Sequence, residues 1–117
     1  MRSFLYGYNF GARAFTSGLG MIAPQLPISF AAYLSEGKQD MAVKIIKKYE
    51  EPVQDAFSSL NIRQFPAGWY HSCCHAVLSL AGLFRSHCMR FPWPTLNQDE
   101  VQSVKKCLAV IDIFKGI

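Results

Sequence analysis

The residue types in this chain that could hold a metal ion are gathered between residues 71 and 88. His71 and His75 are four positions apart, one turn of a helix, and Cys74, His87 and Cys88 could complete a set of nitrogen and sulfur ligands. No pair of cysteines has the CxxC spacing that structural zinc sites usually carry. The pattern therefore favours a packed helix with incidental thiols, and we expect neither a metal nor a cofactor.

A second stretch with the composition of a functional loop is GARAFTSGLGMIAP, residues 11–24. Its glycines lack both the GxGxxG spacing and the following Lys-Ser/Thr of a phosphate loop, so no nucleotide site is predicted. The stretch belongs to an uncharged run from Ala14 to Ser35 that is long enough to cross a bilayer. Pro24, Pro27, several polar side chains and the lack of an aromatic belt argue against a membrane span. We therefore predict a strand followed by a helix.

The N-terminal part of the chain is predicted to contain two short strands and a helix. Phe4–Tyr8 and Ala14–Ser17 are β-compatible runs, and the about five residues between them are too few for a parallel crossover. Either the two strands form a hairpin, or a connecting helix has been lost. Residues 27–36 are then predicted to form a short helix that ends at Gly37.

The rest of the chain has the apolar periodicity of helices. Residues 40–60 are predicted to form a long amphipathic helix, with Asp40 as its N-cap and a bend at Pro52. Residues 66–84 show the same spacing of apolar side chains and are predicted to form a second helix.

The last helix has the clearest start signal. Asn97 as N-cap and Glu100 at the third helical position form a capping-box pattern, and Leu96 can pack on Val101 across the first turn. The buried face that follows is predicted to consist of Val101, Val104, Leu108 and Ile111.

Length and charge restrict the function further. A chain of 117 residues with a net charge of +4 is one small domain at most, and its lysines are spaced as on a solvated helix face, so we expect no nucleic-acid partner. Four cysteines without a framework spacing indicate a reducing compartment, and we expect a cytoplasmic protein. Arg2 and Arg13, with no acid before Glu36, leave a mitochondrial location open.

Four stretches, in the same order, resemble the C-terminal part of the dihydrodipicolinate synthase and N-acetylneuraminate lyase family of Schiff-base aldolases. They read GARAFTSGLGMIAP, SEGKQDMA, IRQFPAGWYHSCCHAVLSLAGL and RFPWPTLNQDEV. The closest similarity is to the 5-dehydro-4-deoxyglucarate dehydratases. The positions that carry it are Phe15, Thr16 and Ser17; Ile62, Arg63, Gly68, Trp69 and Ser72; and Arg90, Pro92, Leu96 and Glu100. Trp69 stands where the family usually has tyrosine.

The resemblance implies an α/β fold, a (β/α)8 TIM barrel with added C-terminal helices, of which this chain covers the last third. Phe4–Gly7 would be the seventh strand and Ala14–Ser17 the eighth, without the helix that normally joins them. Residues 1–36 would hold the last barrel strands and the following helix, and residues 37–117 a C-terminal helical region, in a single incomplete domain. The chain itself is expected to be mostly α-helical with one or two short N-terminal strands.

The resemblance also implies a lyase mechanism, in which a lysine on the sixth strand forms a Schiff base with a 2-oxo acid or keto-deoxy sugar acid and a tyrosine on the fifth strand relays protons. Both strands lie outside this chain, and its own lysines are expected on helices and turns, so we assign no catalytic residue. The family positions that would contact substrate are Gly7, Asn9, Phe15, Thr16 and Ser17. For Ser17 the alternative is a hydroxyl that satisfies a backbone group.

These observations predict a fragment or remnant of a Schiff-base dehydratase or aldolase that is inactive alone. The alternative is a noncatalytic helical interaction module derived from the same family, and a membrane-anchored peptide is a third hypothesis. Because the two predicted strands would have unpaired edges, we expect a homo-oligomer or a partner chain.

Overall fold

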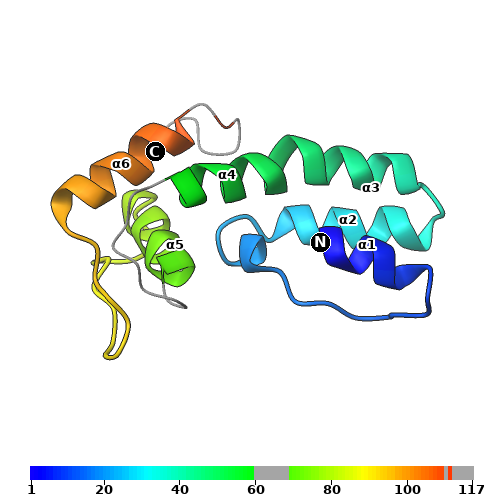
Figure 1. Ribbon diagram of the computed structural model, residues 1–117, viewed down its shortest axis with the longest axis horizontal. Helices are drawn as coiled ribbons and strands as arrows, with labels where there is room; N and C mark the ends of the chain where they lie inside the picture. Colours follow the sequence, from blue (N-terminus) through cyan, green and yellow to red (C-terminus); the bar gives the residue numbers. More distant parts are fainter. Residues whose placement is uncertain (60–68, 110, 112–117) are drawn as a thin grey trace. The chain divides into compact units, whose positions relative to one another are not determined.

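The computed structural model describes residues 1–59, 69–109 and 111, and within these residues the chain is helical and contains no strand (Figure 1). The chain divides into two compact units, Met1–Pro52 and Val53–Ile117. In the following, Met1–Pro52 is called unit 1 and Val53–Ile117 is called unit 2.

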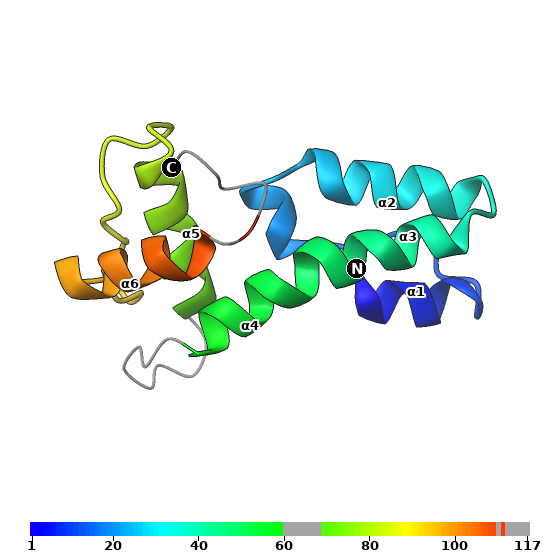
Figure 2. The same cartoon turned by 90° about the horizontal axis from the view of Figure 1, so that it is seen from above.

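Unit 1 is a small helical bundle. Its elements are α1 (Arg2–Tyr8), the 3₁₀ turn η1 (Gly18–Met21), α2 (Gln25–Ser35), α3 (Gln39–Ile45) and the π-helical turn η2 (Ile46–Glu50). Helices α1, α2 and α3 lie side by side in both views (Figures 1 and 2). α1 and α2 are also joined by a hydrogen bond of 3.3 Å that the Tyr8 hydroxyl donates to the Leu34 carbonyl.

Three phenylalanines of unit 1, the buried Phe30 and the half-buried Phe4 and Phe15, form an aromatic cluster. The ring of Phe15 stacks on Phe4 at a centroid distance of 4.6 Å and meets Phe30 edge-on at 5.5 Å. Phe30 is fully buried, and Leu26 and Leu34 of α2 are buried with it. The spacing of these α2 residues, at four positions each, explains why this segment forms a helix: it places all three on one face.

The strand predictions for Phe4–Tyr8 and Ala14–Ser17 are wrong. Phe4–Tyr8 lies inside α1, and Ala14–Ser17 is a connecting segment without ladder hydrogen bonds. A short run with apolar residues at positions 4, 5 and 8 fits a helix as well as a strand, and period alone does not separate the two. An isolated two-stranded hairpin is only marginally stable in water, whereas the helix allows Phe4 to pack against Phe15 and Phe30.

The helix predicted for residues 27–36 is observed as α2, Gln25–Ser35, and its predicted stop at Gly37 is confirmed. Gly37 has a φ of +71°, the left-handed conformation that glycine adopts without strain. The amides of Gly37 and Lys38 donate to the carbonyls of Leu34 and Tyr33, at 3.1 and 2.8 Å, so the last carbonyls of α2 are satisfied.

The long helix predicted for residues 40–60 appears as α3, η2 and α4 (Glu51–Ser59), which follow one another without a break. Asp40 is not its N-cap: Lys38 precedes the helix, and Asp40 lies in the first turn. The irregularity expected at Pro52 is a π-helical turn just before it. Proline has no N–H to donate to the preceding turn, which accounts for the local change in hydrogen-bond pattern.

Unit 2 contains the end of α4, α5 (Trp69–Leu80) and α6 (Gln98–Leu108). Phe57 of α4 meets the ring of Tyr70 edge-on at 5.4 Å, and α5 packs on α6. Among the described residues of this unit, the buried apolar side chains are Val53, Phe57, Cys73, Cys74, Ala76, Val77, Leu78, Leu96, Val101, Val104, Leu108 and Ile111. Val101, Val104 and Leu108 therefore form the inner face of α6 as predicted, and Ile111 is buried beyond the end of the helix.

The start predicted for α6 is confirmed, and the end predicted for α5 is wrong. The Asn97 side chain accepts from the amide of Glu100 at 2.9 Å, and the Glu100 carboxylate accepts from the amide of Asn97 at 2.7 Å. α5 ends at Leu80 rather than at residue 84, because Gly82 adopts a φ of +74° and turns the chain. Residues 66–68 lie outside the described residues.

Candidate functional site

Gly7 and Asn9, two of the expected substrate contacts, lie at the chain reversal after α1. The Gly7 carbonyl accepts from the amides of Phe10 and Ala12, each at 3.0 Å, and a side chain at Gly7 would come within 3.3 Å of the Ala12 methyl group. Asn9 is exposed, and its side-chain oxygen accepts from Gln39 at 3.3 Å. Both residues therefore have a local structural role, in the turn and between α1 and α3.

The other expected substrate contacts, Phe15, Thr16 and Ser17, have different environments. Phe15 is half-buried and stacks on Phe4, Thr16 is exposed, and Ser17 is half-buried at the start of η1. The Ser17 carbonyl accepts from the Gly20 amide at 3.0 Å, while its hydroxyl makes no cap to the 3₁₀ turn. These three residues are neighbours in the sequence, but their side chains have different surroundings and do not form one site.

A shallow pocket lies between the end of α2 and the first turns of α3. It is lined by Gly37, Lys38, Gln39, Asp40, Met41 and Lys44. The Lys38 ammonium lies 2.7 Å from the Glu36 carboxylate, and this hydrogen bond and the charge of Glu36 raise the pKa of Lys38. A raised pKa keeps Lys38 protonated, which is the opposite of what a nucleophilic lysine requires. No pocket was predicted at this position, although the Gly37-Lys38 pair marks the turn that forms it.

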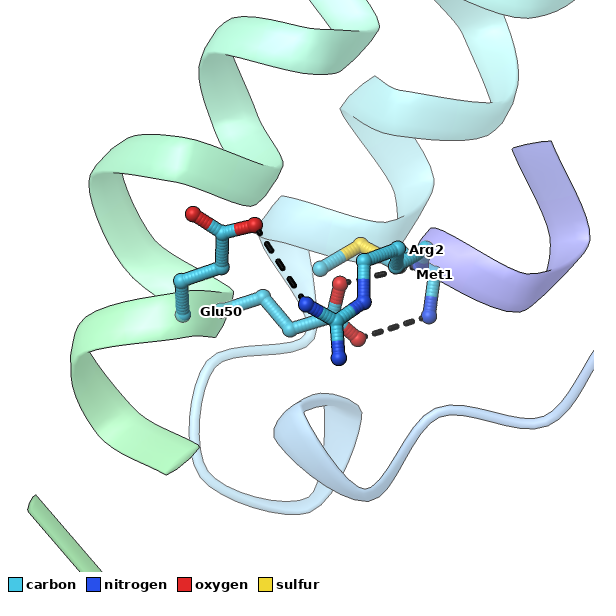
Figure 3. Close-up of polar contacts among 4 residues, drawn as sticks. Met1, Arg2 and Glu50 are labelled. Carbon is cyan, nitrogen blue, oxygen red and sulfur yellow. Dashed lines mark hydrogen bonds and ion pairs between the residues drawn. The ribbon is translucent and has the colours of Figure 1, made fainter. Parts of the chain in front are cut away.

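The most buried polar cluster of unit 1 joins the two ends of its sequence (Figure 3). The Met1 α-ammonium donates to Oε1 of Glu50 at 2.7 Å, and the Arg2 amide donates to Oε2 of the same carboxylate at 3.0 Å. The Met1 side chain is completely buried, and that of Glu50 is 9% exposed. The Arg2 guanidinium lies 3.6 Å from Glu51 at the more exposed edge of the cluster.

Sequence reasoning missed this cluster, although a signal for Glu50 is present. The apolar spacing of the long helix predicts an inner face of Met41, Ile45, Tyr49, Val53, Phe57 and Leu60. Ile45, Val53 and Phe57 are buried as predicted, whereas Met41 is 38% exposed and Ala42, Ile46 and Glu50 are buried in addition. Leu60 lies outside the described residues. Glu50 stands four positions after Ile46 and three before Val53, so an acid occupies a core position and requires a partner.

The histidines of unit 2 are turned toward separate partners. His71 is exposed and stacks on Trp93 at 6.0 Å, His75 meets the ring of Phe84 at 5.1 Å, and Nε2 of His87 lies 3.0 Å from the Leu96 carbonyl. Within the part of the chain that the structure describes, no group of three His, Cys, Asp or Glu residues is placed to hold a metal ion.

The thiols of α5 are buried. Cys73 and Cys74 are both fully buried, and loss of solvation raises the pKa of each to about 12 from the ordinary 9.0; for Cys74 a hydrogen bond from Tyr70 opposes the effect. A thiol with such a pKa remains protonated near neutral pH, and the thiolate is the nucleophilic form. Cys88, by contrast, is exposed.

Several positions that carry the family resemblance have structural contacts. The buried Ser72 hydroxyl donates to the Pro94 carbonyl at 2.7 Å, which ties α5 to the segment before α6. Glu100 completes the capping box, and the Arg90 carbonyl accepts from the Trp93 amide at 3.0 Å. Ile62, Arg63 and Gly68 lie outside the described residues.

No protein family, curated protein or solved structure matches this chain in the comparisons with known proteins. Among the described residues, every helix is too short or too polar to span a membrane.

Proposed function

We propose that this chain is a C-terminal part or remnant of a Schiff-base lyase of the dihydrodipicolinate synthase family, and that it has no lyase activity by itself. The family assignment is supported by the four ordered sequence stretches. It is also supported by the succession of a helix after Pro24, a long helix over residues 39–59, α5, and a capped last helix. This is the succession that the resemblance implies for the last barrel helix and the helices beyond it.

The observation that carries the lack of activity is the placement of the lysines. A Schiff-base lysine must be desolvated so that its amine is neutral near pH 7. Within the described residues every lysine is exposed: Lys38 lies between α2 and α3, and the others lie on helices, namely Lys44, Lys47, Lys48, Lys105 and Lys106. Lys115 lies outside the described residues.

We expect no covalent adduct when the chain is incubated with pyruvate or a keto-deoxy sugar acid and then reduced with borohydride. Intact mass spectrometry measures the adduct, and a full-length family lyase treated in parallel is the positive control. A stoichiometric mass increase on a lysine of this chain would show that it carries its own nucleophile.

A second candidate is a noncatalytic helical interaction module derived from the same family. The observation that favours it is the position of Phe15, which packs between Phe4 and Phe30 in a helical unit rather than on a barrel strand. The described residues contain no strand, so an unpaired strand edge is no longer a reason to expect self-association.

Exposed apolar side chains now give the reason to expect a partner. The most exposed in unit 1 are Tyr6, Phe10 and Ile28, at 70%, 92% and 68%, and the most exposed in unit 2 are Leu83 and Phe91, at 72% and 92%. Burying such side chains against a partner would remove apolar area from water, which favours association. We therefore propose that the chain associates.

Light scattering at micromolar concentration measures this association. We expect species heavier than the 13.2 kDa chain, and their proportion should fall in the double variant Phe10→Ser, Phe91→Ser. The matched control is the double variant Thr16→Ala, Gln102→Ala, which changes one exposed polar position in each unit. A monodisperse species of 13.2 kDa with a cooperative melt would instead favour an independent helical module without a partner of its own kind.

A further inference from the structure

The amino group of Met1 is a charged group with a specific buried partner. Its nitrogen lies 2.7 Å from Oε1 of Glu50, and the whole Met1 residue is 7% exposed, as is Glu50. Burying a carboxylate is unfavourable unless an opposite charge and hydrogen bonds compensate for the lost water. In this structure the ammonium supplies the charge, and the Arg2 amide supplies a second hydrogen bond at 3.0 Å.

The second acid of the cluster does not duplicate this role. Glu51 lies 3.6 Å from the Arg2 guanidinium, and both side chains are well exposed, at 39% and 59%. Exposed ion pairs contribute little to stability because water screens them. Figure 3 shows the Met1 amine and the Arg2 amide joined to the Glu50 carboxylate, and the Arg2 guanidinium joined by a separate dashed line to a second carboxylate.

Acylation of the amine removes the charge but keeps one N–H. The amine nitrogen attacks the carbonyl carbon of an acyl thioester, an N–C bond forms, and the C–S bond breaks. Of the two protons that the ammonium loses, one goes to solvent and one to the departing thiol. The resulting amide is a neutral donor, and a peptide bond to a preceding residue would be equally neutral. Glu50 would then be a buried charge without a counter-charge.

We expect α1 to be the helix that detaches when the Glu50 charge has no counter-charge. It spans seven residues, none of its residues is buried, and its N-cap, Met1, makes no side-chain cap. Isolated helices of this length are unstable in water, so α1 depends on its attachments. Besides the Glu50 contacts, its attachments include the ring contacts of Phe4 with Phe15 and Phe30 and the hydrogen bond from Tyr8 to Leu34. The Arg2–Glu51 ion pair and the hydrogen bond between Gln39 and Asn9, just after the helix, are exposed.

We propose that the charge on the Met1 amine decides whether α1 stays docked on unit 1. With a free ammonium the helix is held against Glu50; with an acylated or peptide-linked nitrogen it is released, and α2 and α3 remain packed. Because the folded chain covers the amine, the acyl group is added to the nascent or unfolded chain. Release of α1 removes Phe4 from Phe15 and Phe30 and exposes their rings as a new apolar surface. This inference does not depend on the lyase family.

Hydrogen exchange on the full chain tests the proposal. The chain is prepared with a free amine and with N-acetyl-Met1, and exchange of the backbone amides from residue 5 to residue 8 is measured by mass spectrometry. We expect exchange in α1 to accelerate at least about tenfold on acetylation, since removing one partner of a buried ion pair is strongly destabilising. Exchange in α5 and α6 should be unchanged.

Two variants show whether Glu50 is the cause. In Glu50→Gln the Met1 ammonium loses its counter-charge, so α1 should already exchange fast in the free chain and acetylation should not accelerate it further. In Glu51→Gln the acceleration on acetylation should persist. Equal exchange rates in the free and acetylated parent chain would overturn the proposal, whether or not either variant folds. An acetylation effect of the same size in Glu50→Gln would also overturn it, because the effect would then not pass through this carboxylate.

Discussion

Folding changes the acid–base behaviour of the Cys73 and Cys74 thiols. Burial raises the pKa of each thiol to about 12, from 9.0 for an exposed thiol. Between these two pH values the unfolded chain has lost its thiol protons while the folded chain keeps them. The unfolded state therefore binds fewer protons, and the free energy of unfolding falls as pH rises from about 9 to about 12.

We expect this fall to have a slope of about 1 kcal/mol per pH unit for each thiol, measured by urea unfolding at several pH values. Other groups also titrate in this range, so the relevant quantity is the difference between the parent chain and Cys73→Ala, Cys74→Ala. The matched control is Cys88→Ala, which removes an exposed thiol. If the double variant keeps the slope of the parent, burial of these thiols is not its cause.

Glu50 shows why some site residues could not be found from the sequence. Its core position could be predicted from the spacing of Ile46, Val53 and Phe57, but its partner could not. The partner is the Met1 ammonium, 49 positions away in the chain, and a backbone amine leaves no residue pattern to recognise. The histidines are the opposite case: their spacing allowed a metal site, and only their contacts show that His71, His75 and His87 have separate partners.

At the scale of the element, α6 is the helix whose start rests on the best-defined contacts. Asn97→Ala removes the side-chain oxygen that accepts from the Glu100 amide at 2.9 Å. We expect the free energy of unfolding to fall by about 0.5–2 kcal/mol, the usual cost of losing an N-cap. Thermal or urea unfolding measures the change.

The control substitutions for this prediction separate the cap from helix propensity. Asn97→Ser keeps an oxygen at the cap and should restore most of the stability, whereas Gln102→Ala changes an exposed position inside the helix and should have almost no effect. A parent-like unfolding curve for Asn97→Ala would show that the helix begins at another residue.

The helices differ in how far the sequence determined them. α2 and α6 were predictable because glycine and asparagine act within a few residues, and Gly37 and Asn97 have the predicted roles. α1 was not, because Phe4–Tyr8 is short enough to fit either period and its conformation depends on Phe15 and Phe30, far along the chain. The π-turn before Pro52 was expected as a bend, and its hydrogen-bond pattern follows from the missing N–H.

At the scale of the whole molecule, the two units have separate cores, and the chain passes from one to the other near the start of α4, between Pro52 and Val53. Phe30 is fully buried in unit 1 and Val104 is fully buried in unit 2. This arrangement predicts that unfolding is not a single two-state transition.

The positions of the two tryptophans make this separation measurable, because Trp69 and Trp93 both belong to unit 2. Tryptophan fluorescence then reports unit 2, while far-ultraviolet circular dichroism reports both units. Phe30→Ala should destabilise unit 1 by about 3–5 kcal/mol, the usual cost of emptying an aromatic core position. In Phe30→Ala we expect part of the circular dichroism signal to be lost at a lower denaturant concentration than in the parent chain, while the midpoint of the fluorescence transition is unchanged. In Val104→Ala we expect the midpoint of the fluorescence transition to fall. Coincident transitions that shift together in both variants would mean that the two cores unfold as one cooperative body, with α4 transmitting the loss from either side.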